Sequence, residues 1–147
     1  HMQGEPRTMQ EQPRYDDVVS EVAEFLAGQV ASALELGISR ERLLVDPGFG
    51  FGKSLQHNLA LLGRLRELAS LQVPLLVGLS RKRMLGALIG GETGREPAAR
   101  VAAGVAAATL AMQAGAAVVR THDVAETVDA AKVVAGLVHK DSSRLRE

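Results

Sequence analysis

The sequence predicts an α/β fold in which short parallel strands alternate with helices. Three short apolar runs, residues 42–46, 74–78 and 116–120, lack the alternation of a half-exposed strand. Longer segments with helical spacing separate these runs, so each strand is expected to lie in a sheet that helices cover. A glycine-rich or charged loop follows each run. In such folds, the loops after the carboxyl ends of the strands carry function.

Apolar residues that recur at helical spacing predict the helices. Ser54 can cap the second helix, and Pro97 suits the first turn of an alanine-rich one. Asp123 and Glu126 form a plausible capping box for the last helix. The predicted helices are residues 16–36, 54–71, a short one within 79–91, 97–114 and 123–138. The polar tail, residues 139–147, is expected to fray.

The composition excludes several classes of protein. The 147 residues suit one domain, and lysine plus arginine equals aspartate plus glutamate at 17 each. This balance gives no indication of a nucleic-acid or membrane partner, and no apolar run is long enough to span a bilayer. The absence of cysteine excludes a disulfide framework and thiolate metal sites, and it fits a cytoplasmic protein.

The stretch "DPGFGFGKS", residues 46–54, has the composition of a phosphate-binding loop but not its spacing. A Walker A loop would need a glycine where the chain has Pro47, and a dinucleotide fingerprint would need one at Lys53. Its glycines instead allow the backbone to approach a flat ligand closely, because they have no β-carbon. Asp46 is a suitable acceptor for ligand N–H groups, although alone it could equally serve the turn.

Arg120 and His122 lie two residues apart at the end of the last predicted strand. In an extended chain they point to the same side. A guanidinium and an imidazole beside a helix N-terminus make a plausible anion site. A lone histidine is more often structural, but the pair favours a binding role.

Four segments together resemble dihydropteroate synthase of the folate pathway. They occur in the family's order and with its gaps over nearly the whole chain: "HMQGEPRTMQ", "LLVDPGFGFGKSLQHN", "PLLVGLSRKRMLG" and "VVRTHDVAETVDA". The family is a (β/α)8 barrel. The resemblance implies that residues 1–147 are a partial pterin-binding TIM-barrel domain, the C-terminal half of the barrel, with the first half missing.

The resemblance also implies a reaction. Family members condense a dihydropterin that carries a CH2-diphosphate with p-aminobenzoate, which releases diphosphate and forms dihydropteroate; sulfonamides compete for the p-aminobenzoate site. The family is expected to use Mg²⁺, whose asparagine ligand would lie in the missing half, and to be homodimeric. The chain alone is therefore expected to be inactive and to self-associate.

The resemblance gives roles to the residues of the first two loops. Asp46 is expected to accept hydrogen bonds from the pterin ring, and Lys82 to donate to it; these two are the catalytic candidates. Gly50, Phe51 and Met2 are expected to line the pterin and amine sites. No metal ligand is expected within the chain.

The remaining candidates surround the substrates' charged groups. The resemblance implies that Arg120 and His122 hold the diphosphate, and that Gly78 and Ser80 border the substrates, although Ser80 could simply cap a helix. Arg83 stands where the family often has a serine near the p-aminobenzoate carboxylate. The contribution of Arg83 stays open, as does that of Lys53 at the base of the glycine-rich loop.

Two other readings compete with a synthase. Other pterin-binding barrels, such as methyltetrahydrofolate-binding methyltransferase domains, share the pterin-facing carboxylate but need neither the segment 80–82 nor the anion pair. A half-barrel could also be a non-catalytic protein that folds only by self-association.

Overall fold

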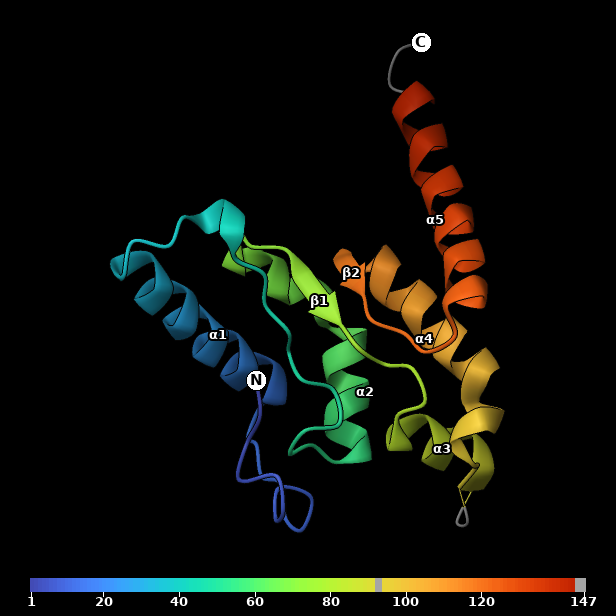
Figure 1. Ribbon diagram of the computed structural model, residues 1–147, viewed down its shortest axis with the longest axis horizontal. Coiled ribbons are helices and arrows are strands. Elements are labelled where there is room, and N and C mark those ends of the chain that lie inside the picture. The colour runs from blue at the N-terminus through green and yellow to red at the C-terminus, as the bar shows by residue number, and fades with distance from the viewer. Residues whose placement is uncertain (92–93, 145–147) are drawn as a thin grey trace.

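The computed structural model describes residues 1–91 and 94–144, and the side chains up to residue 137. Helices dominate it and two strands lie among them (Figure 1). In chain order the elements are α1 (Val18–Glu35), η1 (Arg40–Arg42), α2 (Leu55–Gly63), η2 (Leu65–Leu71), β1 (Leu75–Val77), α3 (Arg83–Gly90), η4 (Pro97–Arg100), α4 (Val101–Gln113), β2 (Ala116–Val119) and α5 (Val124–Arg144). The η elements are 3₁₀ helices.

The strands run parallel, as predicted. Leu75 pairs with Ala116 and Val77 with Val119, so β1 and β2 are neighbours. Val45 forms a single parallel bridge to Leu75 on the other side of β1. Three chain segments therefore run side by side, and the loops that follow them leave at the same edge.

The first predicted strand, residues 42–46, is much shorter than expected. Only Val45 pairs within the described residues, because its N–H donates to Pro74 (3.0 Å) and its carbonyl accepts from Leu76 (2.8 Å). The 3₁₀ turn of η1 takes up Arg42, the first residue of the predicted strand. This segment lies at the edge of the observed sheet, so it has a neighbour on one side alone.

The predicted helix 54–71 divides into two helices of different pitch. Ser54 caps α2, as expected, and His57 completes a capping box. The α-helix ends at Gly63, a residue with low helix propensity. Beyond it Leu65, Leu68 and Leu71 are all buried. Their spacing of three residues matches the three residues per turn of a 3₁₀ helix, so η2 buries all three leucines against α1 and the strands.

The predicted helix 97–114 begins with the 3₁₀ turn η4, with Pro97 in its first turn, and continues as α4. The buried face of α4 consists of small residues: Gly104, Ala107, Ala108 and Ala111. These let the helix approach the loop after β1 closely. A β-carbon built at Gly104 would already be 3.7 Å from the Cα of Ser80.

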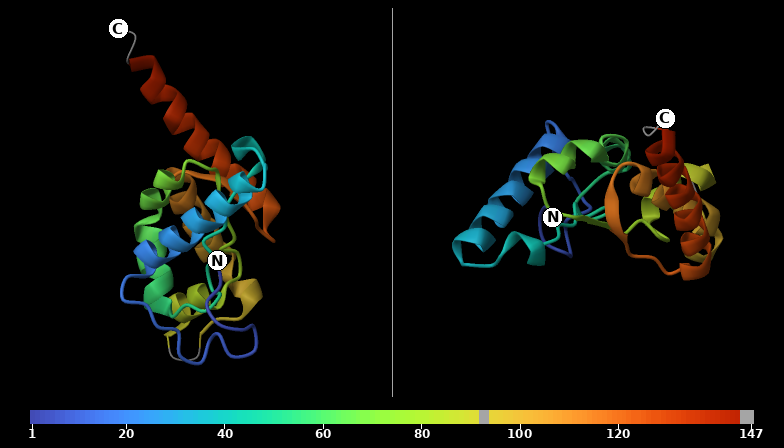
Figure 2. Two further views of the ribbon diagram at one scale, coloured as in Figure 1. Left: turned by 90° about the vertical axis from the view of Figure 1, so that its left-hand side faces the viewer. Right: turned by 90° about the horizontal axis from the view of Figure 1, so that it is seen from above.

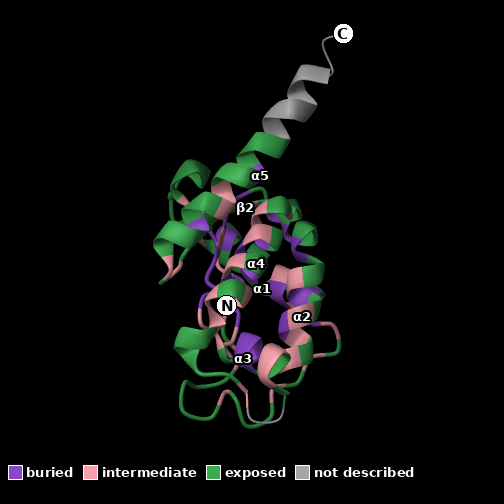
Figure 3. Ribbon diagram, turned by 90° about the vertical axis from the view of Figure 1, so that its right-hand side faces the viewer, coloured by how far each residue is buried: buried purple, intermediate pink, exposed green. Residues whose placement is uncertain are grey.

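The last helix, α5, projects from the rest of the molecule, at the opposite end from α1 (Figure 2). It is exposed along most of its described length, with Thr127 and Val134 as its buried residues (Figure 3). It continues to Arg144 instead of ending near Val138, because residues 139–144 contain neither glycine nor proline. Part of the expected polar tail is thus helical, and residues 145–147 lie outside the described residues.

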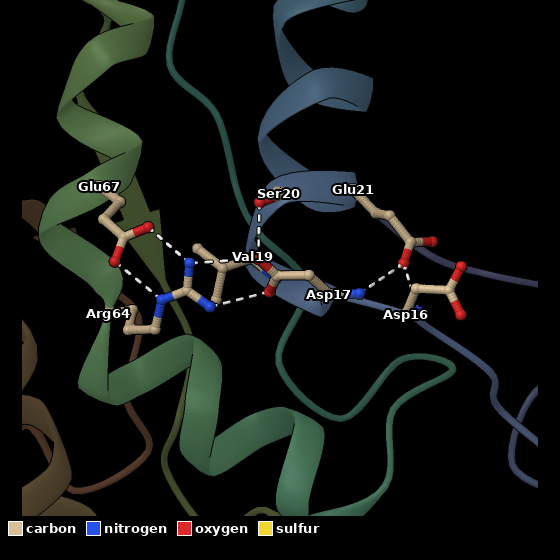
Figure 4. A network of polar contacts seen from close by, with 7 residues as sticks. All are labelled: Asp16, Asp17, Val19, Ser20, Glu21, Arg64 and Glu67. Carbon is tan, nitrogen blue, oxygen red and sulfur yellow. Dashed lines mark hydrogen bonds and ion pairs between the residues drawn. The ribbon is translucent and has the colours of Figure 1, made fainter.

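A polar network ties the start of α1 to the junction of α2 and η2 (Figure 4). Asp17 caps α1 by accepting from the N–H of Val19. Arg64, at the junction, donates to Asp17 (2.8 Å) and to Glu67 (2.8 Å). The hydrogen bond from Arg64 lowers the pKa of the Asp17 carboxyl to about 2. The network therefore fixes the N-terminus of α1 to the junction of α2 and η2.

Candidate active site

The loop after Val45 turns sharply because three of its glycines adopt left-handed conformations. Gly48, Gly50 and Gly52 have φ of 74°, 78° and 59°, which side chains rarely tolerate. The N–H of Gly48 donates to Oδ1 of Asp46 (2.7 Å), which holds that carboxylate at the strand end. Phe49 is buried in the core.

Two buried side chains support this loop from behind. Lys53 has only 3% of its surface exposed, and its Nζ lies 3.0 Å from the carbonyl oxygen of Gly48 and 3.2 Å from that of Phe51. Asn58, on α2, accepts from the N–H of Gly50 (2.7 Å) and donates to the carbonyls of Lys53 and Ser54. Each backbone turn of the loop therefore has a side-chain partner.

Lys82 extends from the loop after β1 across the glycine-rich loop. Its Nζ lies 4.1 Å from the centre of the Phe51 ring, within range of a cation–π interaction. A β-carbon at Gly50 would be 3.3 Å from Cδ of Lys82, so the glycine leaves room for this side chain. Burial lowers the pKa of the Lys82 ammonium, and the charge of Arg120 lowers it further.

Arg120 reaches back from the end of β2 towards the other two loops. Its backbone N–H donates to Val77 (2.8 Å), and its guanidinium lies 3.7 Å from Oδ2 of Asp46. A β-carbon at Gly78 would be 2.8 Å from Nη2 of Arg120, so a glycine is needed there for the guanidinium to lie flat. The residues after Val45, β1 and β2 thus meet at one edge.

Ser80 links the loops after β1 and β2. The serine is buried, and its Oγ lies 3.1 Å from Nδ1 of His122 and accepts from the N–H of the same histidine (3.2 Å). It also donates to Asp123 (3.2 Å). Ser80 therefore orients His122; it does not cap α3, which begins after Lys82.

Asp123 has a different partner from the one that the capping box predicted. Its carboxylate forms an ion pair with Arg81 (2.6 Å), and the hydrogen bond from Arg81 lowers the pKa of the Asp123 carboxyl. Arg81 itself has φ of 57°, and its carbonyl accepts from Arg100 (2.8 Å). The strained residue is thus held on both sides, and it directs the neighbouring Lys82 towards the glycine-rich loop.

Two cavities adjoin these residues, and Lys82 lines both. The smaller, about 180 Å³, is bordered by Gly78, Ser80, Lys82, Arg120, Thr121 and His122. Arg120 and His122 therefore face the same space, as their spacing predicted. With Lys82 they supply three cationic or protonatable groups, which suit an anion.

The larger cavity, about 410 Å³, is bordered by Gln10, Gly50, Lys53, Ser54, Leu55, Asn58, Lys82, Arg83, Met84 and Ala87. Arg83 is exposed at its border, where it could face a ligand carboxylate. Phe51 borders neither cavity, but its ring contacts Lys82, which lines both. Met2, by contrast, borders neither cavity, and 41% of its surface is exposed.

Three side chains that shape the site were not predicted from the sequence. Asn58 stands on the leucine-rich face of α2, and a buried amide among leucines is the signal that could have found it. Gln10 donates to the carbonyl of Gly50 from the N-terminal segment. Arg81 received no role of its own, although an arginine before a predicted helix could have suggested an ion pair with Asp123.

The described residues contain no group of three or more histidine or acidic side chains that could hold a metal ion. The Asp46 carboxylate interacts with the N–H of Gly48 and with the Arg120 guanidinium. In the same part of the chain, no helix is long and apolar enough to cross a membrane.

Comparison with known proteins places this geometry in a family. Residues 1–122 match the family model described as "Pterin binding enzyme". The chain is 50% identical over 145 residues to dihydropteroate synthase of Escherichia coli K12, which covers 98% of the chain and 50% of that protein.

Solved structures are similar over the same region. Dihydropteroate synthase of Yersinia pestis in a sulfonamide complex has a TM-score of 0.89 at 44% identity, over 95% of this chain and 49% of that one. The Xanthomonas albilineans enzyme in complex with 7,8-dihydropteroate has a TM-score of 0.81 at 52% identity, over 85% and 47%. The chain thus spans about half the length of its relatives and has the predicted fold of a partial (β/α)8 barrel. It belongs to the pterin-binding enzyme family.

Proposed function

We propose that the protein carrying this chain is a dihydropteroate synthase, and that this chain supplies the pterin and diphosphate contacts of its active site. The observation that carries the proposal is the convergence of Asp46, Lys82, Arg120 and His122 at the carboxyl ends of three parallel segments. The similar enzymes whose structures hold dihydropteroate or a sulfonamide support the choice of substrates.

In the proposed reaction the amine nitrogen of p-aminobenzoate attacks the CH2 group of the dihydropterin diphosphate. A C–N bond forms, the C–O bond to diphosphate breaks, and the amine loses a proton. Asp46 would accept from the N–H groups along one edge of the pterin. Arg120 and His122 would hold the diphosphate and stabilise the charge that grows on it as it leaves.

Lys82 lies between the cavity proposed for the diphosphate and the cavity proposed for the amine. Because it lines both cavities and contacts the Phe51 ring, it can donate to the pterin while remaining beside the amine site. Its lowered pKa means that burial and Arg120 already disfavour its charge. A ligand acceptor at this point would therefore gain a strong partner.

The anion-binding side of the site favours a synthase over a methyltetrahydrofolate-binding barrel. A methyl transfer from a folate releases no diphosphate and has no need for the pair at the end of β2. Here, Ser80 and Gly78 are arranged to hold His122 and Arg120 in one cavity. The geometry thus supports a substrate that carries both a flat ring and an anion.

The test is formation of dihydropteroate by the whole protein that carries this chain, together with two variants. Asp46→Asn keeps the Oδ1 that accepts from Gly48 but removes the charge, and we expect catalytic efficiency to fall by about 10- to 100-fold, the effect of a lost hydrogen bond to a charged group. Lys82→Met should have an effect of similar size.

Asp129→Asn and Lys132→Met provide matched controls. These two residues form an exposed pair on α5, 3.0 Å apart, and line neither cavity of the site. Both controls should retain full activity. A parent protein with no synthase activity, or Asp46→Asn and Lys82→Met variants as active as the parent, would refute the proposal.

Three further features of this function stay proposals. We infer self-association because large apolar side chains are exposed on α4 and α5: Leu110, Val124, Val128, Val133 and Leu137. Mg²⁺ would have to be held by residues outside those described here. A cytoplasmic location is supported by the absence of cysteine.

A further inference from the structure

Lys53 is a buried lysine that the proposed reaction does not use. Its side chain is enclosed, with 3% of its surface exposed, at the base of the glycine-rich loop. Burial of an ammonium group is unfavourable unless several acceptors surround it. Here its Nζ lies within hydrogen-bonding distance of the carbonyl oxygens of Gly48 and Phe51 and of Nδ1 of His1 (2.9 Å).

The left-handed glycines explain why carbonyl groups surround this ammonium. A residue with positive φ turns the peptide groups beside it into orientations that ordinary helical or extended backbone does not give, and the loop has three such residues in five. The carbonyls of Gly48 and Phe51 consequently converge on one point behind the loop. An ordinary turn would leave those two oxygens facing solvent or each other, whereas here a cation lies between them.

The same loop carries the ligand-facing groups on its other side. The N–H of Gly48 holds Asp46, while the carbonyl of Gly48 is held by Lys53. The carbonyl of Phe51 is likewise held by Lys53, while its ring contacts Lys82. One ammonium group therefore connects, through single residues of the loop, to Asp46 and Phe51, which are both expected to contact the substrates.

We propose that Lys53 is a positioning residue whose ammonium group sets the shape of the loop and thereby orients Asp46 and Phe51. The orientation of substrates rests on the proposed function, but the control of loop shape does not. Asn58 complements it, because it holds the N–H of Gly50 between the two carbonyls.

The number of protons on the Lys53 amine should determine how many hydrogen bonds it can donate to the loop, so the proposal can be tested by changing the pH. Three acceptors need three donors, which only the charged ammonium supplies. A neutral amine keeps two donors, so one acceptor loses its partner or His1 must take up the proton at Nδ1. Burial lowers the pKa of Lys53 to about 8. The loop should therefore change its hydrogen bonding in the mildly alkaline range.

Several titratable groups face Lys53 and bear on this pH dependence. Asp46 favours the charged ammonium, whereas Lys82 disfavours it. Tyr15 lies 6.0 Å from Nζ, and burial raises its pKa to about 12, so it stays neutral in this range. His1 contacts Nζ directly. Variants must therefore separate Lys53 from Lys82.

The first experiment observes the loop without requiring turnover. The protein is labelled with [15N]glycine and titrated from about pH 6 to about pH 10. The amide signals of Gly48, Gly50 and Gly52 should shift together with a midpoint near the pKa of Lys53. A parallel sample labelled at the lysine Nζ should show a slowly exchanging ammonium signal that disappears over the same range.

Three variants assign the titration. Lys53→Met should abolish the glycine shifts near this midpoint, Lys82→Met should retain them, and the exposed Lys132→Met should behave as the parent. If the loop amides do not titrate in the parent, Lys53 does not set the loop's shape. If they titrate alike in Lys53→Met, another group is responsible. The parent titration stands even if Lys53→Met fails to fold.

The second experiment measures binding of a pterin carboxylic acid as probe. Binding is measured at about pH 6 to 6.5, where the Lys53 ammonium is charged and the pterin ring is neutral, and we expect Lys53→Met to bind about tenfold more weakly than the parent. Equal affinity of Lys53→Met and the parent would overturn the role in orientation. If the parent binds no pterin while its loop titrates as described, the proposed function fails and the control of loop shape by Lys53 stands.

Discussion

The guanidinium of Arg120 lies directly against the backbone of Gly78, on the neighbouring strand end. Nη2 would be 2.8 Å from a β-carbon at that position and Nε would be 3.2 Å away. Arg120 is otherwise 63% exposed at its side chain, so little else restrains it. The absence of one methyl group thus allows a long, flexible side chain to lie across the site towards Asp46.

Gly78→Ala should displace Arg120 and weaken anion binding without unfolding the protein, because the end of a flexible side chain can move at little cost. We expect affinity for pyrophosphate at low salt to fall about tenfold, or about 1.4 kcal/mol, measured by calorimetry. Gly136→Ala is the control, because a β-carbon there meets nothing within 4 Å. Equal pyrophosphate affinity in Gly78→Ala and the parent would contradict this arrangement.

Arg120→Ala should weaken pyrophosphate binding more strongly, by about 1.5 to 3 kcal/mol, since it removes a donor that can bind two oxygens at once. Binding to the parent should also weaken with added salt. The decisive measurement is the double variant: Gly78→Ala should have no further effect once Arg120 is alanine. Additive losses would show that Gly78 acts by another route.

Gly48→Ala should be strongly destabilising, because it combines two costs. The residue has φ of 74°, and a β-carbon there would overlap the carbonyl oxygen of His1. Gly37→Ala isolates the first cost, because Gly37 has φ of 83° but no atom within 4 Å of the added carbon. We expect Gly37→Ala to lower the free energy of unfolding by about 1 to 2 kcal/mol and Gly48→Ala to lower it further, by chemical denaturation. Equal losses would mean that the loop can move away from His1.

Acid should weaken the contact between α1 and the junction of α2 and η2. The pKa of Asp17 in the folded protein, about 2, lies below its ordinary value of 3.8. The carboxylate therefore stabilises the fold above about pH 4, and this contribution is lost as the pH falls towards 2. Asp17→Asn keeps the helix cap but removes the charge, so its unfolding midpoint should fall less than that of the parent over this range. Asp129→Asn, in an exposed pair, should follow the parent.

The sequence predicted where the site lies better than it predicted the hydrogen bonds and packing contacts that hold the site residues in place. The spacing of Arg120 and His122 implied one shared side, and both line the same cavity. Three segments were predicted to be parallel strands: 42–46, 74–78 and 116–120. The last two pair as parallel strands, and the first forms a single parallel bridge. The two-residue period of an extended chain was sufficient for the first prediction, and the non-alternating apolar runs were sufficient for the second.

The support could not be predicted, because it depends on long-range contacts. The role of Lys53 follows from where two carbonyls point after left-handed turns, and no periodic pattern encodes this direction. Asp123 has the sequence context of a helix cap, but Arg81 from a distant loop binds its carboxylate. The spacing of the leucines in η2 is compatible with an α-helical stripe and with a 3₁₀ helix. In the structure the α-helix ends at Gly63, and the leucines that follow lie on a 3₁₀ helix.

The backbone of the glycine-rich loop is held by Lys53, Asn58 and the N-terminal segment, while the Phe51 ring contacts Lys82. Recognition and architecture are therefore separable at this position. The Phe51 side chain can change while the peptide groups of the loop keep every partner they have. A substitution at this position should therefore carry little penalty in folding.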